Sequence, residues 1–69
     1  MLVNIEAERA RRRMSKKELA ENLGVSLRTY YNWISRKTAI PSTALKKMSE
    51  MFGVKMEYLI EDSEEKDAG

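Results

Sequence analysis

The stretch "LGVSLRTYYNWI", residues 23–34, places a glycine between two segments whose apolar residues recur at helical spacing. Gly24 suits the left-handed C-cap of a helix, because any side chain is penalised at the backbone angles of such a cap. Ser26 is a preferred N-cap residue and predicts that the next helix begins directly after it. The stretch therefore predicts the end of one short helix, a tight turn and a second short helix that ends near Ser35.

The helix before Gly24 is predicted by its own N-terminal signal. Ser15 followed three residues later by Glu18 forms the S-x-x-E capping box, and Leu19, Ala20 and Leu23 follow as an apolar stripe. Two short helices joined by a glycine-bearing turn of three to four residues are the helix-turn-helix arrangement.

The second of these helices has two unlike faces. At about 100° per residue, one face carries Thr29, Tyr30, Trp33 and Ile34, the opposite face carries Arg28, Tyr31, Asn32 and Ser35, and Leu27 lies at the border. We expect the first face to enter the core and the second to meet solvent or a partner.

The rest of the chain also has helical spacing, and no strand alternation is evident. A first helix is predicted over residues 4–12 with Asn4 as its N-cap. A fourth helix opens at Pro41 and Ser42, buries Ala44, Leu45, Met48 and Phe52, and ends at Gly53. The segment "VKMEYLI", residues 54–60, makes a short fifth helix. We expect an all-α domain over residues 1–60 and a disordered acidic tail over 61–69.

Composition limits the chemistry. The chain has 69 residues, no cysteine and no histidine, which excludes disulfides, thiolate metal sites and the usual general base. We expect no catalytic residue, no metal and no cofactor. No apolar run approaches the roughly 18 residues of a membrane span, and no signal-peptide core follows Met1. An intracellular, cytoplasmic protein with no membrane contact is expected.

Charge is divided unevenly along the chain. Residues 1–60 carry twelve Lys and Arg against six Asp and Glu, whereas residues 61–69 carry five acids and one lysine. A basic body suggests a polyanionic partner. The acidic tail is expected to be a solvated terminus; the alternative is that it competes with DNA for the basic body.

The outer face of residues 26–35 has the chemistry that reads a DNA major groove. Arginine bonds guanine O6 and N7, asparagine does the same with adenine, and apolar atoms meet the thymine methyl. Lys16 and Lys17, at a helix start, suit a phosphate, as do Lys37 and Thr38 beyond the outer-face helix.

The segment "MSKKELAENLGVSLRTYYNWISRKTAIPS", residues 14–42, resembles the helix-turn-helix of the phage repressor/Cro family, also called the Xre family. The matching elements are Ser15, Glu18-Leu19-Ala20, Leu23-Gly24-Val25-Ser26, Thr29, Trp33 and Pro41. With Ile5 and Arg9 before them and "FGVKMEYLI" after, the resemblance covers about residues 4–60. It implies a five-helix bundle that binds double-stranded operator DNA, usually an inverted repeat, as a two-fold dimer.

The outer face and the resemblance together give the expected site residues. Base contacts are expected from Leu27, Arg28, Tyr31 and Asn32. Backbone contacts are expected from Ser15, Lys16, Lys17, Ser26, Thr29, Arg36, Lys37 and Thr38. A weak homodimer is expected through Met56, Tyr58 and Ile60; the alternative is that Met56 and Leu59 only close the core and Tyr58 lies on the surface.

Three positions depart from the family pattern. Lys16 stands where the family commonly has glutamine, which puts adenine recognition there in doubt. Ile34 stands where a glutamate usually partners the first-helix arginine, so Arg9 is expected to find Glu18 or water, or to stay free for phosphate. Arg36 replaces a glycine that often ends the recognition helix, which should strain that end by roughly 1 kcal/mol.

The expected function is a sequence-specific transcriptional regulator, of the phage or prophage repressor type. Contact of Arg11, Arg12 or Arg13 with DNA is left open, because helix ends favour arginine in any case. The main alternative is a protein-interaction module, such as an antitoxin-like or regulatory subunit with the same fold. An RNA-binding adaptor is a more distant alternative.

Overall fold

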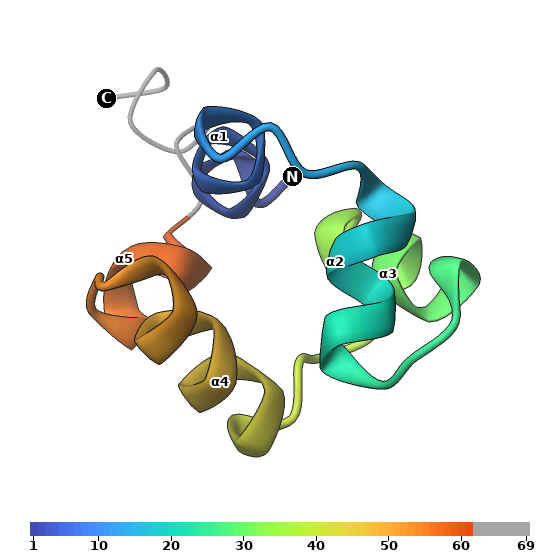
Figure 1. Ribbon diagram of the computed structural model, residues 1–69. Helices are drawn as coiled ribbons and strands as arrows, with labels where there is room; N and C mark the ends of the chain where they lie inside the picture. The colour runs from blue at the N-terminus through green and yellow to red at the C-terminus, as the bar shows by residue number, and fades with distance from the viewer. Residues whose placement is uncertain (62–69) are drawn as a thin grey trace.

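The computed structural model describes residues 1–61, and within them the chain forms five helices and no strand (Figure 1). The helices are α1 (Val3–Arg11), α2 (Lys16–Leu23), α3 (Leu27–Ile34), α4 (Ser42–Phe52) and α5 (Met56–Ile60). The all-α prediction is confirmed. The acidic tail predicted over 61–69 lies outside the described residues, apart from Glu61. None of the five helices is long and apolar enough to cross a membrane.

The caps of α2 and α3 form as the sequence predicts. Ser15 Oγ accepts a hydrogen bond from the Glu18 amide at 3.0 Å, and the Ser15 amide donates to Glu18 Oε1 at 2.7 Å. Gly24 ends α2 with a φ of 74°, and Ser26 Oγ accepts from the Thr29 amide at 3.1 Å to begin α3. These local contacts fix the turn between the two helices.

The prediction for the start of α1 is wrong. The helix begins at Val3, and Asn4 lies inside it instead of capping it. Asn4 Nδ2 donates a hydrogen bond to the carbonyl of Tyr58 at 2.8 Å, which ties α1 to α5. The asparagine serves a contact between helices that are far apart in sequence, so a local capping rule misplaces it.

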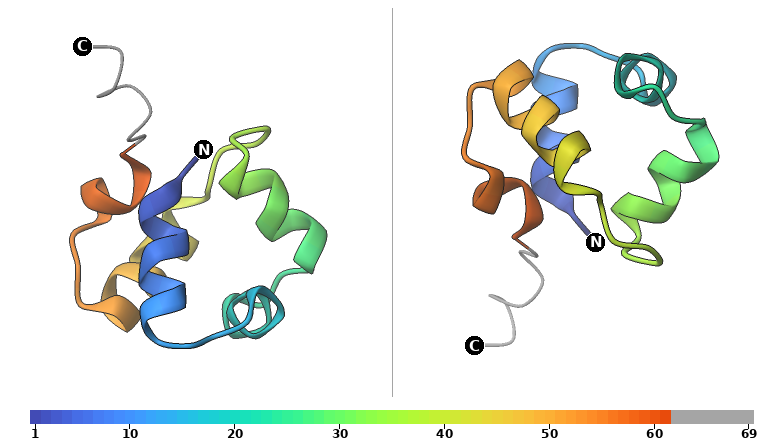
Figure 2. Two further views of the ribbon diagram at one scale, coloured as in Figure 1. Left: turned by 90° about the horizontal axis from the view of Figure 1, so that it is seen from above. Right: turned by 90° about the horizontal axis from the view of Figure 1, so that it is seen from below.

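The helices enclose one small core. In Figure 2, α1 lies between α5 on one side and α3 on the other, and α2 packs against α3 and α4. The buried cluster draws on every helix and on the residue before α1: Leu2, Ile5, Leu19, Ala20, Tyr30, Ile34, Met48, Phe52 and Leu59. Ala44 and Leu45 are only half-buried, so the predicted stripe of α4 is narrower than expected.

Candidate nucleic-acid interface

The two faces of α3 separate as predicted. Tyr30, Trp33 and Ile34 are buried and anchor the helix on its inner side. On the outer side Leu27 is 37% exposed and Tyr31 48% exposed. Arg28 is also exposed, and Asn32 is half-buried. The four residues expected to contact bases therefore all reach the surface of one short helix.

The residues that begin α2 and α3 use their side chains within the protein. Ser15 completes the capping box with Glu18, and Ser26 both accepts from the Thr29 amide and donates to Thr29 Oγ1 at 3.1 Å. A phosphate at these helix starts would therefore meet backbone N–H groups of the first turns and the positive end of the helix dipole.

Lys16 is held beside the outer face of α3. Its Nζ lies 5.5 Å from the centroid of the Tyr31 ring and 3.9 Å from Glu6 Oε1. Lys17, the next residue, is exposed. The two lysines therefore lie at the same helix start in different surroundings: Lys16 is flanked by a ring and a carboxylate with its side chain 41% exposed, and Lys17 is open to solvent.

A second group of polar residues follows the other end of α3. Arg36 has a φ of 68°, so the position where the family has glycine does take a left-handed conformation. The amides of Lys37 and Thr38 both donate to the carbonyl of Asn32, at 2.9 and 3.3 Å. These bonds fold the exposed loop back onto the C-terminal end of α3.

Arg9 does not take the partner expected from the sequence. Its Nη2 lies 3.1 Å from Glu6 Oε1 on the same helix, whereas Glu18 is committed to the capping box. Glu6 Oε2 also accepts a hydrogen bond from the hydroxyl group of Tyr30. The expectation that Arg9 pairs with Glu18 or water, or stays free, is therefore wrong: Glu6 takes the place of the missing glutamate at position 34.

Burial and hydrogen bonding shift the ionisation of this pair. Burial alone would raise the pKa of Glu6, but the hydrogen bonds from Arg9 and Tyr30 outweigh it and hold that pKa below its ordinary value. Burial and the neighbouring carboxylate raise the pKa of Tyr30 far above its ordinary value. The carboxylate and the neutral phenol are thus the stable forms, and together they join α1 to α3.

A second carboxylate, which the sequence did not reveal, lies two residues further along α1 and faces α5 instead of α3. Glu8 is only 2% exposed and accepts from Arg12 Nη1 at 2.7 Å and from the Tyr58 hydroxyl at 3.0 Å. Arg12 also donates to the carbonyl of Phe52 at 2.6 Å, at the end of α4. The sequence gives only a weak indication that Glu8 is buried. Glu8 follows Ile5 by three residues and precedes Arg12 by four, which places it on the inner face of α1 and within reach of a cation.

The arginines of the segment 11–13 differ in their engagement. Arg11 forms an ion pair with Glu8 Oε2 at 3.2 Å, and Arg12 bonds Glu8 and Phe52. Arg13 is exposed and has a φ of 57°.

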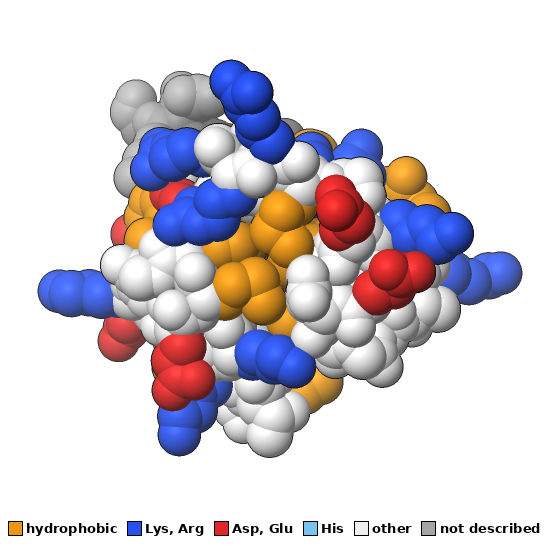
Figure 3. Space-filling view, in the orientation of Figure 1, with side chains coloured by type: hydrophobic (Ala, Val, Ile, Leu, Met, Phe, Trp, Pro, Cys, Tyr) orange, Lys and Arg blue, Asp and Glu red, His pale blue; other side chains and the backbone are white. Residues whose placement is uncertain are grey.

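Figure 3 shows the face of the molecule seen in Figure 1. Lys and Arg side chains project around the edge of this face, including the side where α2 and α3 lie, and apolar atoms lie at its centre.

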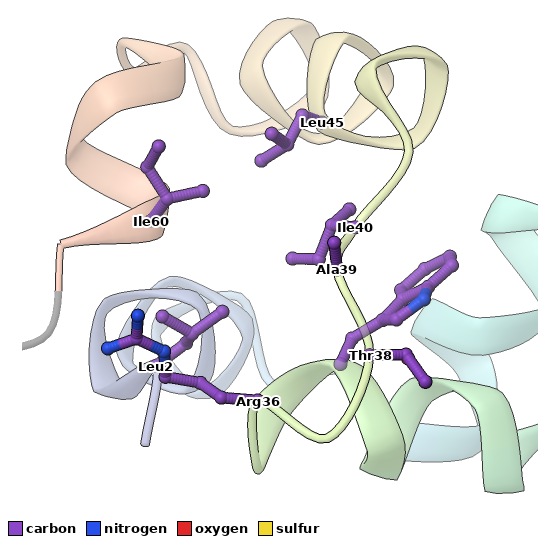
Figure 4. Close-up of a pocket in the computed structure, with 8 residues that line it drawn as sticks. Leu2, Arg36, Thr38, Ala39, Ile40, Leu45 and Ile60 are labelled. Carbon is purple, nitrogen blue, oxygen red and sulfur yellow. The ribbon is translucent and has the colours of Figure 1, made fainter.

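The three residues expected at a dimer interface lie on α5 in unlike surroundings. Met56 is half-buried, and Tyr58 is half-buried with its hydroxyl bonded to Glu8. Ile60 is 48% exposed and borders an open groove of about 400 Å³. Figure 4 shows the groove between α1, the loop after α3, α4 and α5, lined by Leu2, Trp33, Arg36, Thr38, Ala39, Ile40, Leu45 and Ile60.

Comparison with known proteins agrees with this geometry. A family model described as Helix-turn-helix matches residues 5–59, which include all five helices except the ends of α1 and α5. No match was found among curated proteins or among solved structures. The matched family is regulatory rather than enzymatic. The chain belongs to the helix-turn-helix family of the phage repressor/Cro (Xre) type, a family of DNA-binding regulators.

Proposed function

We propose that this protein regulates transcription by binding a specific sequence of double-stranded DNA with α3 in the major groove, in the manner of a phage or prophage repressor. The observation that carries the proposal is the division of α3. Three buried aromatic and aliphatic side chains fix the helix, while Leu27, Arg28, Tyr31 and Asn32 occupy its outer side. A rigidly held helix with hydrogen-bonding groups on one exposed face is what base recognition requires.

Each outer residue has a role in the proposed complex. Arg28 donates two hydrogen bonds to guanine, and Asn32 pairs with adenine N6 and N7. Leu27 and the ring of Tyr31 supply apolar contacts to thymine methyl groups. Half-buried Asn32 has less freedom than Arg28, so we assign the longer reach into the groove to Arg28.

Phosphate contacts are proposed on both sides of these bases. On one side Lys17, Lys16 and the backbone amides after Ser15 approach the DNA; on the other side Arg36, Lys37 and Thr38 do so. Ser26 and Thr29 contribute by fixing the start of α3, because their hydroxyl groups are bonded to each other and the Thr29 amide donates to Ser26 Oγ. The amides of Leu27 and Arg28, the first two of the helix, are proposed to meet the phosphate. Contacts at both ends of α3 would fix its register along the groove.

We propose that two copies bind an inverted repeat, with half-sites about one helical turn, or roughly 34 Å, apart. Exposed Ile60 and the groove beside it, which is lined mainly by apolar side chains, support a self-association surface on α5, and Met56 lies one turn before Ile60 on that helix. Tyr58 has less to offer a second copy, because its hydroxyl is already bonded within the chain.

The same groove favours a second candidate, a protein-interaction module that carries the fold without reading DNA. An apolar groove with an exposed isoleucine can receive a side chain from another protein as well as from a second copy. The two candidates differ in what the outer face of α3 does, and DNA selection separates them.

The test is selection of bound duplexes from a randomised pool at about 150 mM salt. The proposal predicts enrichment of a short inverted repeat, because specific contacts persist when counterion release is weakened. Binding that vanishes as salt rises, without enrichment of any sequence, would leave only a basic helical bundle and favour the protein-interaction candidate.

A further inference from the structure

The carboxylate of Glu6 lies where α1, α2 and α3 meet. Its Oε1 is 3.1 Å from Arg9 Nη2 and 3.9 Å from Lys16 Nζ, and its Oε2 accepts from the hydroxyl of Tyr30. The side chain is 16% exposed, so these contacts are only partly screened by water. One residue of α1 therefore touches a buried anchor of α3 and a lysine of the DNA-facing side.

Lys16 in turn covers part of the outer face of α3. Its ammonium group lies 5.5 Å from the ring centroid of Tyr31, within the range of a cation–π contact. The rings of Tyr31 and Tyr30 lie next to each other, with their centroids 6.4 Å apart. A continuous set of contacts thus runs from Glu6 through Lys16 and Tyr30 to exposed Tyr31.

We propose that Glu6 is a positioning residue that holds Lys16 and Tyr31 as one preset unit on the DNA-facing surface. Its negative charge also restrains Lys16 from binding any phosphate within reach. The inference rests on the proposed DNA-binding function and adds to it a source of specificity outside the helix-turn-helix.

The physical argument concerns the freedom of a lysine. An unrestrained ammonium group on a four-carbon stem contacts phosphate in any sequence, and each such contact adds about 0.9 to the salt dependence of binding. When the salt concentration changes fourfold, the loss or gain of one such contact changes the affinity about threefold. A lysine that lies between a carboxylate and a ring adds little to the sequence-independent attraction to phosphate. Its fixed position suits the one DNA sequence whose backbone comes within its reach.

The first test replaces Glu6 by glutamine, E6Q, and uses E50Q as the matched control. Glu50 is exposed on α4, so E50Q makes the same change in charge without touching Lys16. Compared with E50Q, E6Q should bind random duplex about threefold more tightly at low salt, with a salt slope steeper by about 0.9. The ratio of affinities for selected and random duplex should fall by about threefold.

A spectroscopic test needs no DNA. The ε-methylene protons of Lys16 should be shifted upfield by the Tyr31 ring in the wild-type chain, with Lys17 as the internal reference. E6Q should move the Lys16 shift to that of Lys17. If E6Q matches E50Q in affinity for random duplex, or if the Lys16 shift is unchanged in E6Q, the inference is overturned.

Because Glu6 also bonds Tyr30, a second variant avoids disturbing the joint between α1 and α3. Lys16→Gln alters a side chain that is 41% exposed and leaves Glu6 bonded to Arg9 and Tyr30. It should weaken binding to the selected duplex at least threefold more than binding to random duplex. Equal losses on both would contradict the inference. A wild-type chain that selects no sequence would instead contradict the proposed function, so the two failures are distinguishable.

Discussion

Arg36, like Arg13, has a side chain at a backbone conformation that favours glycine. With a φ of 68° it lies in the left-handed region, which costs a residue with a Cβ roughly 1–2 kcal/mol. The strain was expected from the sequence, because a glycine often stands at this position in the family. A cation placed there is suited to a phosphate, which is a reason for a DNA-binding protein to keep it.

Substitutions of Arg36 measure the backbone strain separately from any contact of the side chain with DNA. Arg36→Gly should raise the free energy of unfolding by about 1 kcal/mol relative to Arg36→Ala, since both lose the side chain and only glycine relieves the backbone. Denaturant unfolding without DNA measures the difference. An Arg36→Gly chain no more stable than Arg36→Ala would show that the left-handed conformation carries no strain here.

For single residues, the sequence predicts correctly which side of α3 is buried, but it does not predict which residues bond one another. The spacing of α3 predicts Tyr30 and Trp33 in the core and Arg28 and Tyr31 at the surface. The structure agrees, because the helical period decides which way a side chain points. The partner of Arg9 depends on where α3 lies relative to α1. No local pattern contains that information.

Among the helices, α2 has the most complete local signals. The capping box closes its start through two hydrogen bonds, and Gly24 closes its end. By contrast, α4 begins after Pro41 with no side-chain cap bond, and α5 has only five residues and none either. The helix-turn-helix is therefore defined by its own sequence, whereas α5 depends on packing against α1 and α4.

Loss of the α2 cap should be measurable. Ser15→Ala should lower the free energy of unfolding by about 1 kcal/mol, because the Glu18 amide loses its acceptor. Ser42→Ala, at an exposed helix start without a cap bond, is the control and should change stability by less than about 0.5 kcal/mol. Thermal unfolding of both variants tests the expectation, and equal effects would contradict it.

For the whole molecule, the buried carboxylate of Glu8 joins α1 to α5 through Tyr58 and to the end of α4 through Arg12. Hydrogen bonding to Arg12 holds the pKa of Glu8 below its ordinary value, with help from Tyr58 and against the opposing effect of burial. Through Arg12 the same group reaches the carbonyl of Phe52, while the Arg12 guanidinium lies 4.7 Å from the centroid of the Phe52 ring. This joint replaces part of the apolar core that so short a chain cannot supply.

The joint should make the protein sensitive to acid. The folded-state pKa values of Glu6 and Glu8 are lowered, so their stabilising effect is present above the unfolded pKa of roughly 4.3 and is lost as the pH falls through the lower folded values. Glu8→Gln should reduce the free energy of unfolding by about 2 kcal/mol at pH 7, since one charged acceptor of several donors is removed.

The pH profile distinguishes this account from a simple packing defect. The difference between wild type and Glu8→Gln should start to shrink as the pH falls below the unfolded pKa of roughly 4.3, and should be lost as the pH passes through the lowered folded pKa of Glu8. Glu21→Gln, on an exposed part of α2, is the matched control and should follow wild type at every pH. A difference between wild type and Glu8→Gln that stays constant with pH would contradict the assignment.

The proposed self-association involves the whole molecule. Ile60→Ser, at an exposed position, should leave affinity for a single half-site unchanged. It should lower affinity for the full inverted repeat by about tenfold or more, because two linked binding events reinforce each other. Titration of both duplexes measures the two affinities. An equal loss on the half-site would show that Ile60 acts on the fold or on DNA contact.

The limits of sequence-based prediction lie at this scale. Helix number, the turn and the outer face follow from local spacing and caps. The Glu8 joint, the bond from Asn4 to Tyr58 and the groove beside Ile60 bring together residues far apart in the chain. A charged residue on a mainly apolar face, such as Glu8, is read from sequence as solvent-exposed until the structure shows its partners.

The central claim, that the outer face of α3 reads bases, is tested most directly by comparing wild type with Arg28→Ala on the selected duplex. Each base pair of the half-site is changed in turn, and both chains are titrated. The account predicts that Arg28→Ala loses about 1–3 kcal/mol on the selected duplex and no longer discriminates at one base pair per half-site, while its affinity for random duplex changes little. A uniform loss on selected and random duplexes alike would contradict it.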